Sequence, residues 1–356
     1  MQRIRAIDGL RGVAVALVVT GHASEAYAPT WTGSVRAVVG NSSLGVRLFF
    51  VLSGYLITSL LLREQAKYGG ISLTQFYARR CLRIFPAFYV FLAAVGIAAA
   101  FHWIAVSREQ FVAAATFTWN YSALWHRGGP ADGAWFLGHL WTLSLEEQFY
   151  LAWPSTIVLL GWTRARWLTL AIPLAMPLIR VAIYFAFPDQ RGHLGMMFHT
   201  AIDSILVGCA FAVWQSRMPR RLAESQAILL IAIAFVTIAS PIIAENVQGY
   251  RVTIGFGLDA VAAGIMILHT QRGGVFAQAL SAPGLPQLGL ISYSLYLWQQ
   301  LFLTTRNTSW SGSLPVSIAC AFGVAVTSYF LIELPFLRLK NRLAAHERVA
   351  VQPSFG

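Results

Sequence analysis

The sequence predicts an all-α polytopic membrane protein with about ten transmembrane helices and with both termini in the cytoplasm. Of its 356 residues, 57% are hydrophobic and only 11% are charged, whereas a soluble domain carries roughly 25% charged residues. The deficit of charge extends along the whole chain, and apolar runs recur throughout it. A globular domain with a single anchor would concentrate its apolar residues in one place.

Ten hydrophobic runs are candidates for membrane-spanning helices. A helix needs about 20 apolar residues to cross the hydrocarbon core, and several runs are near or below this length. In chain order the runs are 8–27, 43–62, 84–104, 139–161, 167–186, 202–216, 227–244, 252–270, 288–305 and 315–334.

The distribution of basic residues predicts the orientation. With the N-terminus inside, most of the 26 Lys and Arg residues fall on the cytoplasmic side, as the positive-inside rule requires. The net charge of +12 then has a topological origin, so we expect no nucleic-acid partner. We predict one integral-membrane domain over residues 1–340 and a basic cytoplasmic tail over 341–356. Arg11 interrupts the first apolar run, which favours an uncleaved helix over a signal peptide.

Two connections are longer than tight turns. Aromatic residues alternate with arginines in 63–83, which is typical of a helix at the membrane interface. The external stretch 105–138 contains a segment, 111–121, that fits a surface or re-entrant helix. The three cysteines are far apart and have no ligand spacing, so we expect no metal site.

Arg11 and His22 are polar residues within the first apolar run. Eleven steps of about 100° place both on one helix face, about 16 Å apart along the axis. This is half of a hydrocarbon core of about 30 Å, so the histidine would lie near the middle of the membrane. An ionisable side chain at that depth indicates function. The alternative is a hydrogen-bonded histidine and an arginine that reaches the headgroups.

Two further groups of charges lie at or in the spans. Arg80 and Arg83 are neighbours on a helix face, and guanidinium groups pair well with phosphate oxygens of a ligand or of lipids. Glu146 and Glu147 enter an apolar helix about 100° apart, so we expect one of them to face the interior. Other acids in the spans, Asp203, Asp259 and Glu333, are more typical of buried structural partners. Motifs of serine hydrolases, ATPases and Rossmann enzymes are absent from the sequence.

Six motifs in order resemble the acyltransferase 3 family of integral-membrane sugar O-acyltransferases. They are Ile7–Gly12 with the Arg11 to His22 spacing, Gly45–Ile57, Arg80-x-x-Arg83, Trp141–Tyr150, Ile291–Trp298 and Glu333–Phe336. Two positions depart from the family pattern: Gln299 stands where a histidine is usual, and Arg47 where an acid is frequent. The length of the chain resembles the stand-alone members that have no fused hydrolase-like domain.

The resemblance implies transfer of an acyl group, with acetyl expected, from acyl-coenzyme A to a hydroxyl of a cell-surface glycan, glycolipid or lipid-linked sugar. Polysaccharide and lipopolysaccharide are the expected acceptors, and the bacterial inner membrane is the expected location. His22 would be the general base, and Glu146 would orient its imidazole or stabilise the imidazolium. Arg80 and Arg83 would hold the donor phosphates, and Arg11 is expected among both the catalytic and the donor-binding residues. The residues expected to support the substrate or the structure are Asp8, Ser53, Trp141, Glu147, Tyr150, Asp203, Tyr296 and Glu333. A transporter without chemistry is the alternative, because buried His, Arg and Glu also suit proton relays.

Overall fold

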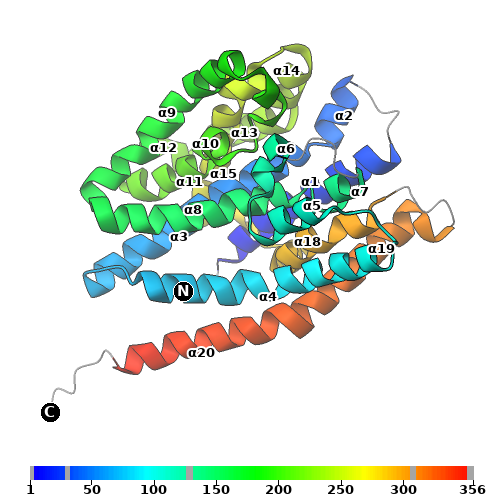
Figure 1. Ribbon diagram of the computed structural model, residues 1–356. Helices are drawn as coiled ribbons and strands as arrows, with labels where there is room; N and C mark the ends of the chain where they lie inside the picture. Colours follow the sequence, from blue (N-terminus) through cyan, green and yellow to red (C-terminus); the bar gives the residue numbers. More distant parts are fainter. Residues whose placement is uncertain (1–3, 29–32, 126–130, 305–309, 351–356) are drawn as a thin grey trace.

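The structure is a computed structural model that describes residues 4–28, 33–125, 131–304 and 310–350 (Figure 1). Over these ranges the regular structure is helical and contains no strand, which confirms the all-α class. The longer helices are α1 (Arg5–Tyr27), α3 (Ser42–Tyr68), α4 (Leu73–Ala100), α8 (Leu140–Leu160), α9 (Trp162–Ala186), α15 (Phe256–Arg272), α19 (Leu314–Ser328) and α20 (Leu334–Ala350).

Shorter elements connect or extend these helices. They are α2 (Gly33–Val39), α5 (Arg108–Ala115), α6 (Ser122–Trp125), α7 (Ala131–Phe136), α10 (Phe198–Ala201), α11 (Asp203–Trp214), α12 (Arg221–Glu224), α13 (Gln226–Ala234), α14 (Ser240–Asn246), α16 (Gly274–Leu280), α17 (Leu285–Leu290) and α18 (Ser292–Phe302). Single π-helical turns continue α13, precede α15 and link α19 to α20.

Seven helical segments of the described chain are long and apolar enough to cross a membrane. They are Arg5–Tyr27, Gly33–Tyr68, Leu73–Ala100, Trp162–Ala186, Gln226–Asn246, Arg251–Arg272 and Leu314–Arg342. Each coincides with one of the ten predicted spans, so the chain is a multi-pass membrane protein. The other three runs form α8, α11 and α18. The last two have 12 and 11 residues, short of the roughly 20 needed to cross.

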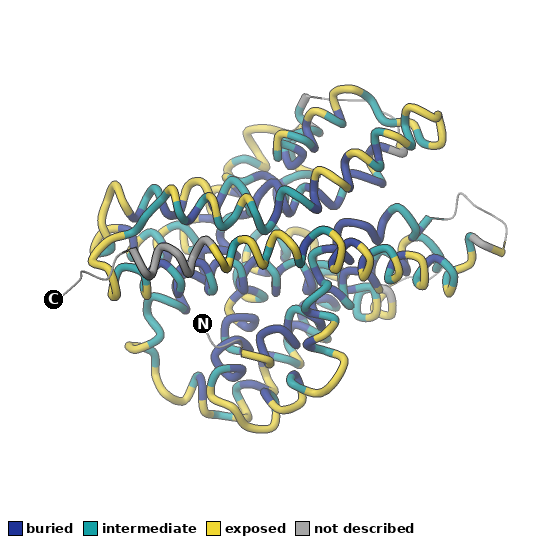
Figure 2. The backbone as a smooth tube through the Cα atoms, turned by 90° about the horizontal axis from the view of Figure 1, so that it is seen from below, coloured by how far each residue is buried: buried dark blue, intermediate teal, exposed yellow. Residues whose placement is uncertain are grey.

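The outer faces of the bundle are apolar. Large side chains such as Leu159, Leu174 and Phe185 are more than 70% exposed, whereas soluble monomers rarely expose wide apolar patches. Figure 2 shows the buried parts of the chain gathered in the interior, with exposed residues along the outer helices. Most residues of α11 and α18 are buried. Protein therefore encloses both of these short helices.

Residues 73–83 of the predicted interfacial helix form the first three turns of α4 and continue directly into the predicted span. The Ser72 side chain accepts a hydrogen bond from the backbone N–H of Gln75 and so caps the helix. The helix then continues through Pro86 to Ala100. Phe76 is buried in the protein core, so this segment packs against other helices and not only against lipid. The arginines are thereby fixed on a membrane-length helix.

The C-terminal helix α20 lies alongside α4 at one edge of the bundle, and α9 lies at the opposite edge (Figure 1). This helix runs past the predicted domain boundary at residue 340 as far as Ala350. Residues 351–356 of the predicted tail lie outside the described residues. In the long connection 105–138, α5 begins with a capping box formed by Ser107 and Gln110. It covers part of the helix predicted over 111–121.

Candidate active site

A cavity of about 340 Å³ lies between α1, α3, α4, α8, α18 and α20. It brings together residues that are far apart in the sequence. The predicted site residues that line it are Arg11, Ser53, Arg80, Arg83, Glu146, Tyr150 and Tyr296. The other predicted residues lie outside this lining. Apolar side chains of α3, among them Phe49, Leu52 and Leu56, complete the wall.

Five basic residues contribute to the cavity. Arg79, Arg80 and Arg83 come from α4, Arg11 from α1 and Lys340 from α20. Arg79 forms an ion pair with Glu64, with Nη2 and Oε2 3.0 Å apart, so its charge is largely neutralised. The guanidinium of Arg80 instead lies 4.6 Å from the centre of the Tyr150 ring, a cation–π contact. The positive potential of the cavity therefore comes mainly from the other four cations.

Glu146 forms the acidic part of the wall. Its Oε1 accepts a hydrogen bond of 2.7 Å from Ser53 Oγ, which in turn accepts one of 3.1 Å from the Tyr150 hydroxyl. Glu147 is outside the lining, so only one of the adjacent carboxylates faces the cavity. The carboxylate of Glu146 interacts electrostatically with Arg80 and Arg11. Ser53 and Tyr150 thus join Glu146 to Arg80, which lies against the Tyr150 ring.

His22 occupies a different place, near the end of α1 that is remote from Arg11. Its Nδ1 lies 3.0 Å from Oε1 and 2.7 Å from Nε2 of Gln299, a residue of α18 with no exposed surface. The edge of the Trp135 ring packs against the imidazole, with ring centres 6.3 Å apart. Gln299, the departure from the family pattern, is therefore the hydrogen-bond partner of His22.

Glu146 and His22 have different hydrogen-bond partners, Ser53 for the carboxylate and Gln299 for the imidazole. Glu146 belongs to the cluster with Ser53 and Arg11, and His22 lies three turns beyond Arg11 on the continuous helix α1, about 16 Å along its axis. A carboxylate held near one end of that interval does not reach an imidazole at the other. The side-chain amide of Gln299 takes the orienting position that we assigned to Glu146.

The sequence motifs did not indicate His139 as a candidate site residue. It precedes α8, is 4% exposed, and interacts electrostatically with His22. The ring of Tyr296, which lines the cavity, is 5.3 Å from that of His139. The spacing between His139 and Glu146 in the sequence could have indicated this residue. His139 lies seven residues before Glu146, and seven helical steps of about 100° return to nearly the same face.

The remaining predicted residues surround the cavity. Asp8 is buried one turn before Arg11 and interacts electrostatically with it. Glu333 accepts a hydrogen bond from the Ser294 hydroxyl and interacts electrostatically with Arg83 and Arg11. Trp141 packs edge-on against Phe50, with ring centres 5.8 Å apart. Asp8, Glu333 and Trp141 therefore lie where they can hold the cationic residues and the walls of the cavity in place.

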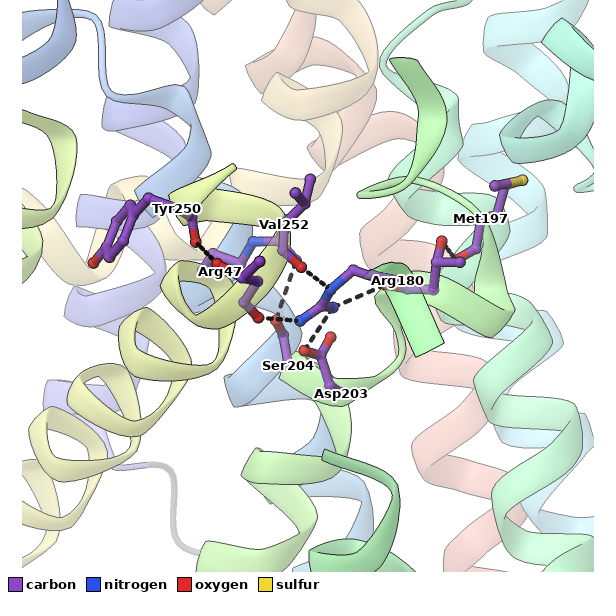
Figure 3. A network of polar contacts seen from close by, with 9 residues as sticks. Arg47, Arg180, Met197, Asp203, Ser204, Tyr250 and Val252 are labelled. Atoms are coloured by element: carbon purple, nitrogen blue, oxygen red, sulfur yellow. Dashed lines mark hydrogen bonds and ion pairs between the residues drawn. The ribbon is translucent and has the colours of Figure 1, made fainter. Parts of the chain in front are cut away.

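Asp203 lies in a separate ionic network (Figure 3). Its Oδ2 is 2.8 Å from Nη1 of Arg180, and the same nitrogen donates to the Thr200 carbonyl at 2.9 Å. Arg47, the other departure from the family pattern, donates to Ser204 Oγ at 3.1 Å. None of these residues is among those that line the cavity. The arrangement supports a structural role for Asp203.

The comparisons with known proteins agree with the motifs. The chain is 30% identical, over 93% of its length, to the peptidoglycan O-acetyltransferase OatA of Listeria monocytogenes. It is 29% identical over its whole length to a putative O-acetyltransferase of Staphylococcus aureus, SACOL0978. It is 26% identical, over 93% of its length, to the putative peptidoglycan O-acetyltransferase YrhL of Bacillus subtilis. No solved structure gives a significant match.

The matched region has a defined extent. It covers 55%, 60% and 54% of these three relatives, so the chain spans little more than half of their length. The sequence profile described as "Acyltransferase domain" matches residues 4–334, which include the cavity lining apart from Lys340, together with His22. The chain therefore belongs to this family of acyltransferases, as the six motifs predicted.

Proposed function

We propose that this protein is a membrane-embedded O-acyltransferase that moves an acyl group, acetyl in the simplest case, from acyl-coenzyme A to a glycan hydroxyl. The observation that carries the proposal is the layout of the cavity. Arg80 of α4 lies against the Tyr150 ring. Thr142 lies eight residues before Tyr150 on α8, about 12 Å along the axis, and is hydrogen-bonded to Tyr296, which also lines the cavity. Donor binding and proton transfer would thus occupy adjoining regions.

The cavity suits the chemistry of coenzyme A. Its phosphates would be held by Arg80, Arg83 and Lys340, since charge-assisted contacts to phosphate oxygens are the strongest hydrogen bonds available to these side chains. The pantetheine arm would pass along the apolar wall of α3. The buried cluster of Arg11, Glu146 and Ser53 would flank it. The thioester would then arrive at Thr142 and Tyr296.

His22 would act as the general base. When Gln299 Oε1 accepts a hydrogen bond from Nδ1–H, the lone pair of the imidazole is on Nε2. Nε2 can then take the proton of an acceptor hydroxyl within hydrogen-bond reach. The hydroxyl oxygen attacks the acyl carbon, the new C–O bond forms and the C–S bond breaks. Gln299 would hold the imidazole in place; its amide can accept from Nδ1–H through Oε1 or donate to Nδ1 through Nε2, and the base role uses the first arrangement.

The acceptor would be a cell-surface glycan, glycolipid or lipid-linked sugar. Two relatives carry names that specify peptidoglycan, which supports a glycan of the cell envelope, with polysaccharide and lipopolysaccharide as further candidates. We place the protein in the bacterial inner membrane with both termini in the cytoplasm. The basic residues of α4 and α20 support this orientation, because they would meet coenzyme A from the cytoplasm.

Acetyl transfer can be tested on the purified protein in lipid vesicles. Acetyl-coenzyme A with a labelled acetyl group is supplied together with peptidoglycan fragments or other glycans. Release of free coenzyme A together with label on the glycan supports the enzyme, whereas label that crosses the bilayer still attached to its carrier supports a transporter. His22→Ala should abolish transfer in protein that inserts normally; full activity in this variant would exclude His22 as the base.

A further inference from the structure

The helices α3 and α8 run in the same direction, and two contacts between them give their register. Ser53 of α3 donates to Glu146 of α8 at 2.7 Å, and Thr58 of α3 accepts a hydrogen bond of 2.9 Å from the indole of Trp153 of α8. The partners are 93 and 95 positions apart in the chain. This register matches each position of α8 along the cavity with a position of α3.

The cavity ends at the same level on three helices. Its first lining residue is Val46 on α3 and Thr142 on α8, and the register places Thr142 level with the turn of α3 that follows Val46. On α18 the last lining residue is Tyr296, whose hydroxyl is hydrogen-bonded to that of Thr142. The next side chains outward, His139 three residues before Thr142 and Gln299 three residues after Tyr296, are not among the lining residues. Val46, Thr142 and Tyr296 therefore form an end wall of the cavity.

The ring of Tyr296 is the part of this end wall that is held most firmly. Its hydroxyl donates to the His139 carbonyl at 2.7 Å and contacts Thr142, so a side chain of α18 is tied to the beginning of α8. The ring also packs edge-on against the rings of Phe49 and His139, with centres 6.3 and 5.3 Å apart. Tyr296 is 9% exposed. The ring therefore cannot swing aside without the loss of a buried hydrogen bond and of its packing.

The end wall lies where the acyl group of the donor would be placed. The proposed route of the pantetheine arm brings the thioester to Thr142 and Tyr296. Gln299, which holds His22, follows Tyr296 by three residues on α18, about 4.5 Å along the axis. An acetyl group has a single methyl beyond its carbonyl and can stop at the end wall, within one helical turn of Gln299. Each further methylene would need the space that the ring of Tyr296 occupies.

We propose that this end wall restricts the donor to short acyl groups, acetyl above all, and that Tyr296 is the residue that sets the limit; this rests on the proposed function. One methylene more than an apolar site is built for typically costs about 10-fold to 200-fold in kcat/KM. The wild-type protein should therefore prefer acetyl-coenzyme A over butyryl-coenzyme A, which has two more methylenes, by about 10²-fold or more. Equal kcat/KM for the two donors would contradict the limit.

The first test shortens the side chain at the end wall. Tyr296→Ala makes room for further methylenes, so the ratio of kcat/KM for butyryl-coenzyme A to that for acetyl-coenzyme A should rise roughly 10-fold or more. Both donors are measured on one preparation, so the fraction of folded protein cancels in the ratio. Tyr250→Ala is the matched control, because Tyr250 is 7% exposed and donates to Ser240 at 3.1 Å but is not a lining residue. An unchanged ratio in Tyr296→Ala, or an equal rise in Tyr250→Ala, overturns the proposal.

A binding measurement on the wild-type protein covers the case in which Tyr296→Ala does not fold. The probes are S-ethyl-, S-butyl- and S-hexyl-coenzyme A, thioethers that cannot transfer their alkyl group. Kd should rise about 10-fold or more from the ethyl to the butyl compound and rise again for the hexyl compound. Equal affinity for all three overturns the length limit. Absence of any transfer from acetyl-coenzyme A contradicts the proposed function instead, so the two failures are distinguishable.

Discussion

Nδ1 of His22 lies 3.0 Å from Oε1 of Gln299, although 277 positions separate the two residues in the chain. The contact joins the first membrane helix to α18 and fixes the orientation of the imidazole. A neutral amide at this place can accept a hydrogen bond from Nδ1–H but cannot take up a proton as a carboxylate or imidazole would. Gln299 is therefore suited to positioning and not to proton transfer.

Replacement of Gln299 by Met, which has a similar shape, should lower kcat by roughly 10-fold to 100-fold, because a buried hydrogen bond of about 1–3 kcal/mol that orients the base is lost. KM for the donor should stay constant, since Gln299 is not among the residues that line the cavity. Steady-state kinetics with acetyl-coenzyme A measure both parameters. The control Gln278→Met changes an exposed glutamine and should have no effect. An unaltered kcat in Gln299→Met would show that the imidazole is oriented by another group.

The membrane helices themselves could be predicted from the sequence. The seven segments that meet the length and composition of a membrane span all fall on predicted runs, since lipid contact demands apolar side chains at nearly every outward position. For α11 and α18 the prediction of a full span was less successful. Protein encloses these helices, and hydropathy does not distinguish burial in protein from burial in lipid.

The site could be predicted only in part. Arg80 and Arg83 face one cavity as their i, i+3 spacing suggested, and Glu146 rather than Glu147 faces it. Which side chains of different helices contact each other could not be predicted from the sequence, because it depends on which helices pack together. Gln299 meets His22 through a contact between α1 and α18, and no periodicity within one helix indicates such a contact. Lys340 was overlooked for the same reason, since only the packing of α20 beside α4 brings it to the cavity.

The donor site should depend on individual positive charges. Arg80→Gln or Arg83→Gln removes a charge-assisted contact of about 1.5–3 kcal/mol, so KM for acetyl-coenzyme A should rise roughly 10-fold to 100-fold and kcat should change much less. Arg79→Gln should have a smaller effect, because Glu64 already pairs with Arg79. The exposed Arg164 provides the control Arg164→Gln. Isothermal titration with desulfo-coenzyme A separates binding from catalysis, and equal affinity in all four variants would contradict the phosphate site.

In the buried ion pair of Arg180 and Asp203, each side chain should stabilise the fold by neutralising the charge of the other. Both side chains are at most 1% exposed, so Arg180→Met removes the hydrogen-bonded cation of a buried carboxylate and should destabilise the fold by about 3–5 kcal/mol, or less where Arg47, which also interacts electrostatically with Asp203, compensates its charge. Replacing both residues, as Arg180→Met with Asp203→Leu, should restore most of the loss. Recovery should be incomplete, because the Thr200 carbonyl also loses its donor. Thermal unfolding in detergent measures these differences, and a double variant no more stable than Arg180→Met would show that the pair does not act as a unit.

Close packing between α3 and α11 depends on two glycines. A Cβ atom on Gly54 would lie 1.9 Å from the carbonyl oxygen of Ile205, and one on Gly208 would lie 2.1 Å from that of Val51. Helices in membranes approach closely through such small residues. Gly54→Ala or Gly208→Ala should therefore force the helices apart and destabilise the protein by about 1–3 kcal/mol, the usual effect of overpacking.

The matched control for these variants is Gly323→Ala in α19, where an added Cβ meets nothing within 4 Å. Alanine is favoured over glycine inside a helix by roughly 0.5–1 kcal/mol, so this variant should be at least as stable as the wild type. Unfolding temperatures in one detergent compare all three variants. Because α3 carries Ser53 and the apolar wall of the cavity, the two destabilised variants should also bind the donor more weakly. Normal stability of Gly54→Ala would mean that α3 and α11 can separate without cost, contrary to the tight contact seen between their backbones.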